Sequence, residues 1–118
     1  MTENKKTEEY IPMNRLDAYR VAKEFIRAVV ACQIGDAKLR EQGVRAAQSC
    51  CLNIAEATGR GSKADRARVF HIARGECCEA IAAVEIAEAS NTCSVAHAAT
   101  ACRLGTRLYV ILNGLIRR

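Results

Sequence analysis

Apolar residues recur every three or four positions along most of the chain, which is the spacing of one face of an α-helix. Short breaks at residues 34–36, 59–61 and 90–92 divide this pattern into four segments. Because short connections force neighbouring helices to run in opposite directions, the pattern predicts an all-α fold, an antiparallel up-down-up-down four-helix bundle over residues 13–118. The expected helices cover residues 13–33, 37–58, 63–89 and 93–117.

The breaks carry residues that are typical of helix starts. Asp36 precedes the second expected helix and is a predicted N-cap, because its side chain can accept a hydrogen bond from a backbone N–H of the first turn. Ser62 and Asp65 resemble a capping box at the start of the third helix. Before the bundle, residues 1–12 are mostly polar and are predicted to form a disordered N-terminal tail.

The second expected helix carries a continuous polar stripe on one face. Its polar residues follow one another at steps of three or four, and small apolar residues occupy the opposite face. The stripe consists of Gln42, Arg45, Ser49, Asn53, Glu56 and Arg60. Three interpretations are open: a face in contact with water, a hydrogen-bonded network or polar subunit interface, and a ligand site. In the second interpretation, Asn53 and Glu56 would meet Arg74 or Glu79 of the next helix.

Composition favours closely packed helices. Half of the 118 residues are hydrophobic, but only 4% are aromatic and tryptophan is absent, so the expected core consists of small and aliphatic side chains. The sequence contains no run of about 18 apolar residues, so we expect no contact with a membrane. Seven cysteines and the lack of a recognisable signal peptide lead us to expect a reducing, cytoplasmic location.

The cysteines include two adjacent pairs, Cys50-Cys51 and Cys77-Cys78. Counted from the turn between the second and third helices, the two pairs lie about 10 Å apart along the bundle, at about 1.5 Å per helical residue. A four-coordinate zinc ion cannot bridge that separation, and a dyad of Cys50 with His71 would lack an orienting carboxylate. We therefore expect small core side chains, no metal, no cofactor and no catalytic residue.

Positive charge is concentrated in the later part of the chain. The formal net charge is +5, the isoelectric point is near 9.0, and the excess lies beyond residue 36. The predicted topology brings the end of the second helix, the start of the third and the end of the fourth together. The basic residues expected there are Arg60, Lys63, Arg66, Arg68, Arg117 and Arg118. They are either solubilising charge or a surface for RNA or DNA, and the scattered tyrosines predict no sequence readout.

Two further arginines, Arg103 and Arg107, lie one turn apart in the fourth expected helix. Like charges at this spacing destabilise an isolated helix slightly. We expect them to form interhelical salt bridges with Glu79 and Glu76, whose levels along the bundle are similar. Contact with phosphate is the alternative.

The most specific pattern lies in the second and third expected helices. It reads Q-x-x-R-A-A-x-S-x-x-x-N-I-A-E-x-x-G-R-x-S, followed by F-x-I-A-R-G and a glutamate four residues after that glycine. This pattern resembles the four-helix-bundle family named after proteins encoded in 23S rRNA intervening sequences. The chain departs from the family at Ala57 and Glu76, where glycine and serine are usual. The matching residues are Gln42, Arg45, Ala46, Ala47, Ser49, Asn53, Ile54, Ala55, Glu56, Gly59, Arg60, Ser62, Phe70, Ile72, Ala73, Gly75 and Glu79.

The resemblance implies a bundle that assembles into a ring-like homopentamer. It also implies kinship with the accessory variability determinant of diversity-generating retroelements, a basic pentamer that partners a reverse transcriptase and binds nucleic acid. No catalytic activity is established for the intervening-sequence family. We therefore expect a non-enzymatic, homo-oligomeric accessory or scaffold protein with weak, sequence-independent affinity for nucleic acid. The alternative is a protein-binding subunit that recruits a neighbouring enzyme, such as a reverse transcriptase, without touching nucleic acid.

Overall fold

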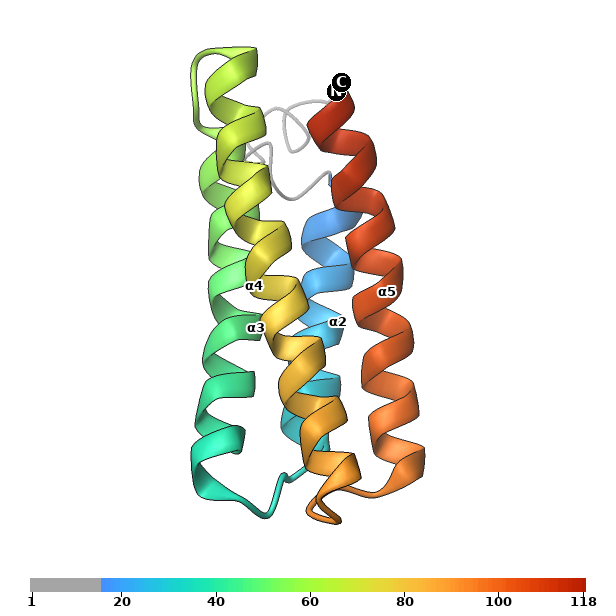
Figure 1. Cartoon of the computed structure of the whole chain (residues 1–118). Coiled ribbons are helices and arrows are strands. Elements are labelled where there is room, and N and C mark those ends of the chain that lie inside the picture. Colours follow the sequence, from blue (N-terminus) through green and yellow to red (C-terminus); the bar gives the residue numbers. More distant parts are fainter. Residues whose placement is uncertain (1–15) are drawn as a thin grey trace, which may run out of the picture.

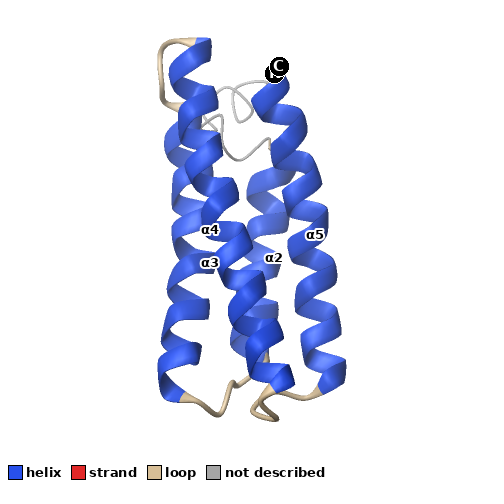
Figure 2. Cartoon of the chain, in the orientation of Figure 1, coloured by secondary structure: helices blue, strands red, loops and turns tan. Residues whose placement is uncertain are grey.

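A computed structural model describes residues 16–118 as four helices, with no strand in that part of the chain (Figures 1 and 2). The expected tail over residues 1–12 and the expected helical residues 13–15 lie outside the described residues. The all-helical prediction is confirmed for the rest. The helices are α2 (Asp17–Ala31), α3 (Ala37–Thr58), α4 (Lys63–Ala89) and α5 (Val95–Arg117).

The three turns and the chain end define two ends of the molecule (Figure 1). The upper end holds the α3–α4 turn, the end of α5 and the start of α2. The lower end holds the α2–α3 and α4–α5 turns. These two lower turns are joined directly, because the N–H of Gly35 donates a 2.8 Å hydrogen bond to the carbonyl oxygen of Thr92.

Side-chain caps fix where three of the helices begin. Asp36 accepts a hydrogen bond from the N–H of Leu39, and Ser62 accepts one from the N–H of Asp65, which confirms both predicted caps. Ser94 caps α5 in the same way, so that helix begins at Val95 rather than at residue 93.

Helix α2 ends earlier than the sequence pattern predicts, at Ala31 instead of residue 33. Gln33 has a φ angle of 45°, in the left-handed region that commonly ends helices. The chain then turns at Ile34, which is 1% exposed and closes the core at the lower end.

The core combines larger side chains on α2 and α5 with small ones on α3 and α4. Phe25, Leu108 and Leu112 are fully buried, whereas the facing surfaces of α3 and α4 are mainly alanine and cysteine. Gly105 is required where α5 crosses this core, because a Cβ atom there would lie 2.6 Å from Cγ1 of Ile81. Small residues therefore set how closely these helices approach.

No helix in the described part of the chain combines the length and the apolar character that a membrane crossing requires.

Candidate functional site

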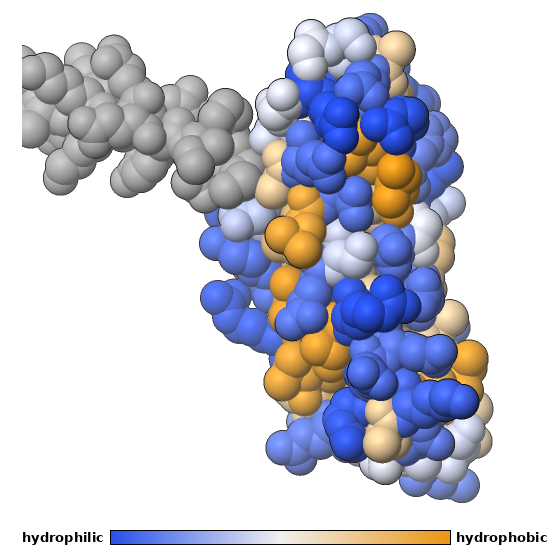
Figure 3. Space-filling model, turned by 90° about the vertical axis from the view of Figure 1, so that its left-hand side faces the viewer, coloured by the Kyte–Doolittle hydropathy of each residue, from blue (hydrophilic) through white to orange (hydrophobic). Residues whose placement is uncertain are grey.

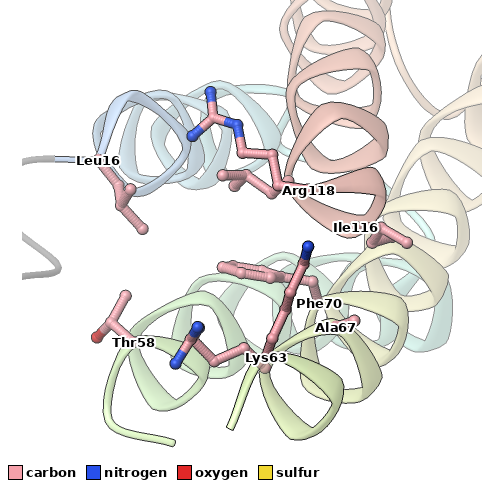
Figure 4. A pocket seen from close by; sticks show the side chains of 9 residues that line it. Leu16, Thr58, Lys63, Ala67, Phe70, Ile116 and Arg118 are labelled. Atoms are coloured by element: carbon pink, nitrogen blue, oxygen red, sulfur yellow. The ribbon is translucent and has the colours of Figure 1, made fainter. Parts of the chain in front are cut away.

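The upper end contains a cavity of about 500 Å³ between the ends of several helices (Figure 4). Helix α3 contributes Thr58, α4 contributes its first two turns, and α5 contributes its last residues. The lining residues are Leu16, Thr58, Lys63, Arg66, Ala67, Phe70, Leu115, Ile116 and Arg118. Three of the six basic residues singled out in the sequence therefore surround a single hollow.

Two other basic residues of this end are held by carboxylates. Arg60 forms ion pairs with Glu56 on its own helix and with Asp65 at the start of α4, where the nitrogen–oxygen distance is 3.4 Å. Nε of Arg68 donates to the same Asp65 at 3.0 Å. Asp65 thus ties the turn to the first residues of α4 and partly neutralises both arginines.

The other cations of the upper end lack such partners. Within residues 16–118, no carboxylate lies within 4 Å of the charged groups of Lys63, Arg66, Arg117 or Arg118. Arg66 instead donates a 3.2 Å hydrogen bond to the carbonyl oxygen of Arg60, which leaves its charge uncompensated. Clustered cations with few opposing carboxylates create a positive potential that attracts anions.

The polar stripe of α3 divides into separate local contacts. Arg45 reaches across to α4 and forms an ion pair with Glu79 at 3.3 Å, between exposed side chains. Asn53 donates to the carbonyl oxygen of Ser49 at 2.9 Å, inside its own helix, and Glu56 pairs with Arg60. The expected contacts of Asn53 and Glu56 with Arg74 or Glu79 are therefore absent among residues 16–118, and no buried network centres on them. Gln42 is exposed.

Arg74 belongs to a group that the sequence pattern does not predict. Its guanidinium donates to Oδ1 of Asn113 at 2.6 Å and to Nδ1 of His71 at 3.0 Å, and it lies 5.8 Å from the ring centre of Tyr109. These contacts link α4 to α5. The only signal in the sequence is the similar level of Arg74 and Asn113 along the bundle.

The expected salt bridges of Arg103 and Arg107 with Glu79 and Glu76 do not form: no ion pair joins them in the described part of the chain. Both arginines lie on the exposed face of α5, while Glu79 turns to Arg45 on the opposite side of α4. Two residues at the same height along the bundle do not necessarily touch, because the rotation of each helix about its axis also decides which side chains meet.

The cysteine pairs are closer than the sequence predicts. Both Cys50 and Cys77 are buried in the core, and the proximity of Cys77 together with burial raises the pKa of Cys50. The thiol of Cys77 donates to the carbonyl oxygen of Gly105 at 3.3 Å. The expected offset of about 10 Å is wrong because the α3–α4 connection continues along the bundle before α4 begins (Figure 1), which shifts the levels of the two helices. His71 is exposed and bonds Arg74 rather than Cys50.

No group of three or more histidine, cysteine, aspartate or glutamate residues within residues 16–118 has an arrangement that would hold a metal ion. The thiols of Cys50 and Cys77 are buried in the core, where a substrate would not reach them. The arrangement with a distinct chemical character is therefore the basic upper end.

These features define a class, the four-helix-bundle proteins with one cationic end. A model of the family described as 23S rRNA-intervening sequence protein matches residues 14–114. The chain therefore belongs to the 23S rRNA-intervening sequence protein family. No curated protein is similar enough to add a second comparison. The match does not extend to the accessory variability determinant, so that part of the resemblance stays a prediction.

Proposed function

We propose that this chain is a non-enzymatic accessory or scaffold protein, an antiparallel up-down-up-down bundle that assembles as a ring-like homopentamer and binds RNA or DNA through its upper end. The observation that carries the proposal is the charge imbalance there. Of the six cationic side chains at this end, Arg60, Lys63, Arg66, Arg68, Arg117 and Arg118, only Arg60 and Arg68 form an ion pair within residues 16–118. Such a surface suits phosphate, which contributes most of the sequence-independent affinity for nucleic acids.

The chemistry of the upper end favours contact with the backbone rather than with bases. Reading unpaired bases commonly uses aromatic faces on which they stack. Phe70, the aromatic residue of the upper cavity, is only 5% exposed, and Tyr109 is engaged by Arg74. The binding is therefore expected to be similar for RNA and DNA of different sequence.

Assembly is supported by apolar side chains that the single chain leaves exposed. Leu52 is 71% exposed and Val110 is 62% exposed. Leu52 also lines an apolar groove between α2 and α3, together with Tyr19 and Ile26, and Figure 3 shows hydrophobic side chains in a broken column along one face. Exposed apolar surface of this kind commonly marks protein interfaces. In a ring, each additional copy would add another basic end.

A binding measurement with matched double variants tests the nucleic-acid part. Fluorescence anisotropy would follow labelled single-stranded RNA and DNA of two unrelated sequences. We expect Lys63→Glu/Arg117→Glu to weaken binding of all probes at least ten-fold, because two phosphate contacts become repulsive. Lys38→Glu/Arg27→Glu is the control, with the same charge change away from the upper end. Equal weakening by both variants, or no binding by the native chain at low salt, would refute the proposal.

Light scattering tests the assembly separately. The native chain is expected to have about five times the mass of the 12.9 kDa subunit, and Leu52→Glu is expected to lower that mass if the apolar groove forms the subunit contact. Lys38→Glu, on the same helix and also exposed, is the control. A native mass equal to one subunit would rule out the ring.

The same apolar surface favours a second candidate function, a protein-binding subunit that recruits an enzyme such as a reverse transcriptase. In that case a pull-down with the tagged chain recovers one protein in the same amount before and after nuclease treatment. Leu52→Glu abolishes that recovery, whereas Lys63→Glu/Arg117→Glu leaves it unchanged. The opposite pattern would favour direct binding to nucleic acid.

A further inference from the structure

The cavity at the upper end combines an apolar floor with a cationic rim. Phe70, Leu115 and Ile116 provide aromatic and aliphatic surface, and Leu16 closes the cavity from the start of α2. In Figure 4 the side chain of Lys63 extends past the ring of Phe70 toward Arg118. A volume of about 500 Å³ lies within the range of roughly 300–1,000 Å³ typical of small-molecule sites.

The charges at the rim of the cavity favour a negatively charged ligand group. None of the nine lining side chains carries a carboxylate. Lys63 and Arg118 have no ion-pair partner within residues 16–118, and Arg66 is bound only to the carbonyl oxygen of Arg60. An anion placed between Lys63 and Arg118 would be held by charges that nothing else in the described structure neutralises.

The floor of the cavity favours a ligand with an aliphatic chain over one with an aromatic ring. Phe70 is 5% exposed, so its ring offers no open face on which a base or another ring can stack. Leu16, Leu115 and Ile116 are partly exposed and pack at the edge of the core. Covering these three side chains with hydrocarbon would remove apolar surface from water without requiring a hydrogen-bond partner.

We propose that this cavity binds an aliphatic carboxylate, with the carboxylate between Lys63 and Arg118 and the hydrocarbon chain over Leu16, Leu115 and Ile116. The site shares cations with the proposed nucleic-acid surface, but it does not depend on that function. It makes the upper end responsive to a small amphipathic acid, which would compete with phosphate for Lys63 and Arg118.

Isothermal titration of the full chain with decanoate, below its micelle concentration, tests the site. We expect saturable binding of one decanoate per chain, and binding of 1-decanol that is at least ten-fold weaker because the alcohol lacks the charge. Shortening the acid to octanoate should weaken binding by up to about four-fold for each methylene that is no longer buried. Equal affinity for decanoate and decanol, or no saturable binding, would overturn the proposal.

A variant that fills the cavity separates this site from the nucleic-acid surface. Ala67→Leu adds bulk at a lining residue and keeps every cation, so decanoate binding should fall at least ten-fold while RNA binding is retained. Ala64→Leu, exposed on the same helix and outside the lining, should leave both unchanged. Matching thermal midpoints verify that both variants fold. Undiminished decanoate binding by Ala67→Leu would place the ligand elsewhere and contradict the proposal.

The source of the carboxylate is also testable, because the sequence of residues 1–15 contains two glutamates, Glu8 and Glu9, close to Ile11. If the double variant Glu8→Gln/Glu9→Gln binds decanoate and the native chain does not, the cavity serves the chain's own carboxylates. That result would overturn the proposal of a free ligand. Equal binding by both chains supports it.

Discussion

The two ends of the bundle differ in how they are held together. At the lower end, two turns are joined by the hydrogen bond from Gly35 to Thr92, Ile34 is buried beneath them, and Arg40 donates a 2.6 Å hydrogen bond to the carbonyl oxygen of Ile34. At the upper end a single turn meets the start of α2 and the end of α5 around an open cavity. The comparison indicates that buried and hydrogen-bonded groups hold the lower end together, whereas the upper end combines a cavity with cations that have no ion-pair partner among residues 16–118.

Both ends are hollow, but the hollows differ in charge. The lower cavity, of about 660 Å³, includes Cys32, Cys93 and His97 together with Glu88. Burial and contact with Cys93 raise the pKa of the Cys32 thiol to about 12, so this thiol stays neutral at physiological pH. The upper cavity has three cationic side chains and no carboxylate side chain in its lining. An anionic ligand is therefore expected at the upper end.

The largest expected effect comes from removing the buried side chain of the lower end. Ile34→Ala should lower the free energy of unfolding by about 2–5 kcal/mol, because a fully buried aliphatic side chain is replaced by a cavity. Ile116→Ala, at the partly exposed upper end, should lower it by about 1 kcal/mol or less. Denaturant unfolding of the two variants measures both values, and equal losses would contradict the division between the ends.

A smaller effect is expected from the hydrogen bond that joins the lower turns. Gly35→Pro removes the N–H that donates to Thr92 and should cost about 1–3 kcal/mol of stability, because the carbonyl oxygen loses its partner. Gly35→Ala keeps the donor, and its Cβ atom would lie at an ordinary contact distance of 3.5 Å from Cβ of Thr92. Thermal unfolding should therefore separate the two variants. Equal stability would show that this bond contributes nothing measurable.

The smallest stability effect is expected at the upper end. Asp65→Asn removes its ion pairs with Arg60 and Arg68, and all three side chains are partly exposed. Such pairs contribute about 0–1 kcal/mol each, so the unfolding midpoint should change little. The same substitution should tighten binding of RNA and DNA, because Arg68 loses its competing carboxylate and Arg60 keeps only that of Glu56. Anisotropy measures the affinity, and weaker binding by Asp65→Asn would argue against a phosphate surface.

How far the sequence predicts this structure depends on the kind of contact. The caps at Asp36 and Ser62 depend on neighbouring residues, and sequence analysis finds them. The gathering of Lys63, Arg66 and Arg118 depends on chain direction alone, because short turns bring these helix ends together.

Contacts between helices are harder to predict. Whether Cys50 and Cys77 lie at the same height along the bundle depends on how far the α3–α4 connection runs along it before α4 begins. The hydrogen bond of Arg74 to Asn113 depends on the rotation of α4 and α5 about their axes. Hydrophobic periodicity indicates which face is buried, but it sets the rotation of a helix only to within about one side chain. For this reason the sequence pattern predicts contact of Arg103 with Glu79, whereas in the structure Glu79 pairs with Arg45.

The most direct test of the central claim is the salt dependence of nucleic-acid affinity. For each phosphate that a cation neutralises, the slope of log affinity against log salt changes by roughly 0.7 for single strands. The account predicts that Lys63→Glu/Arg117→Glu makes this slope shallower than that of the native chain by about 1.4 or more. Lys38→Glu/Arg27→Glu should leave the slope unchanged. A slope that is the same for the native chain and both variants would show that the upper end does not contact phosphate.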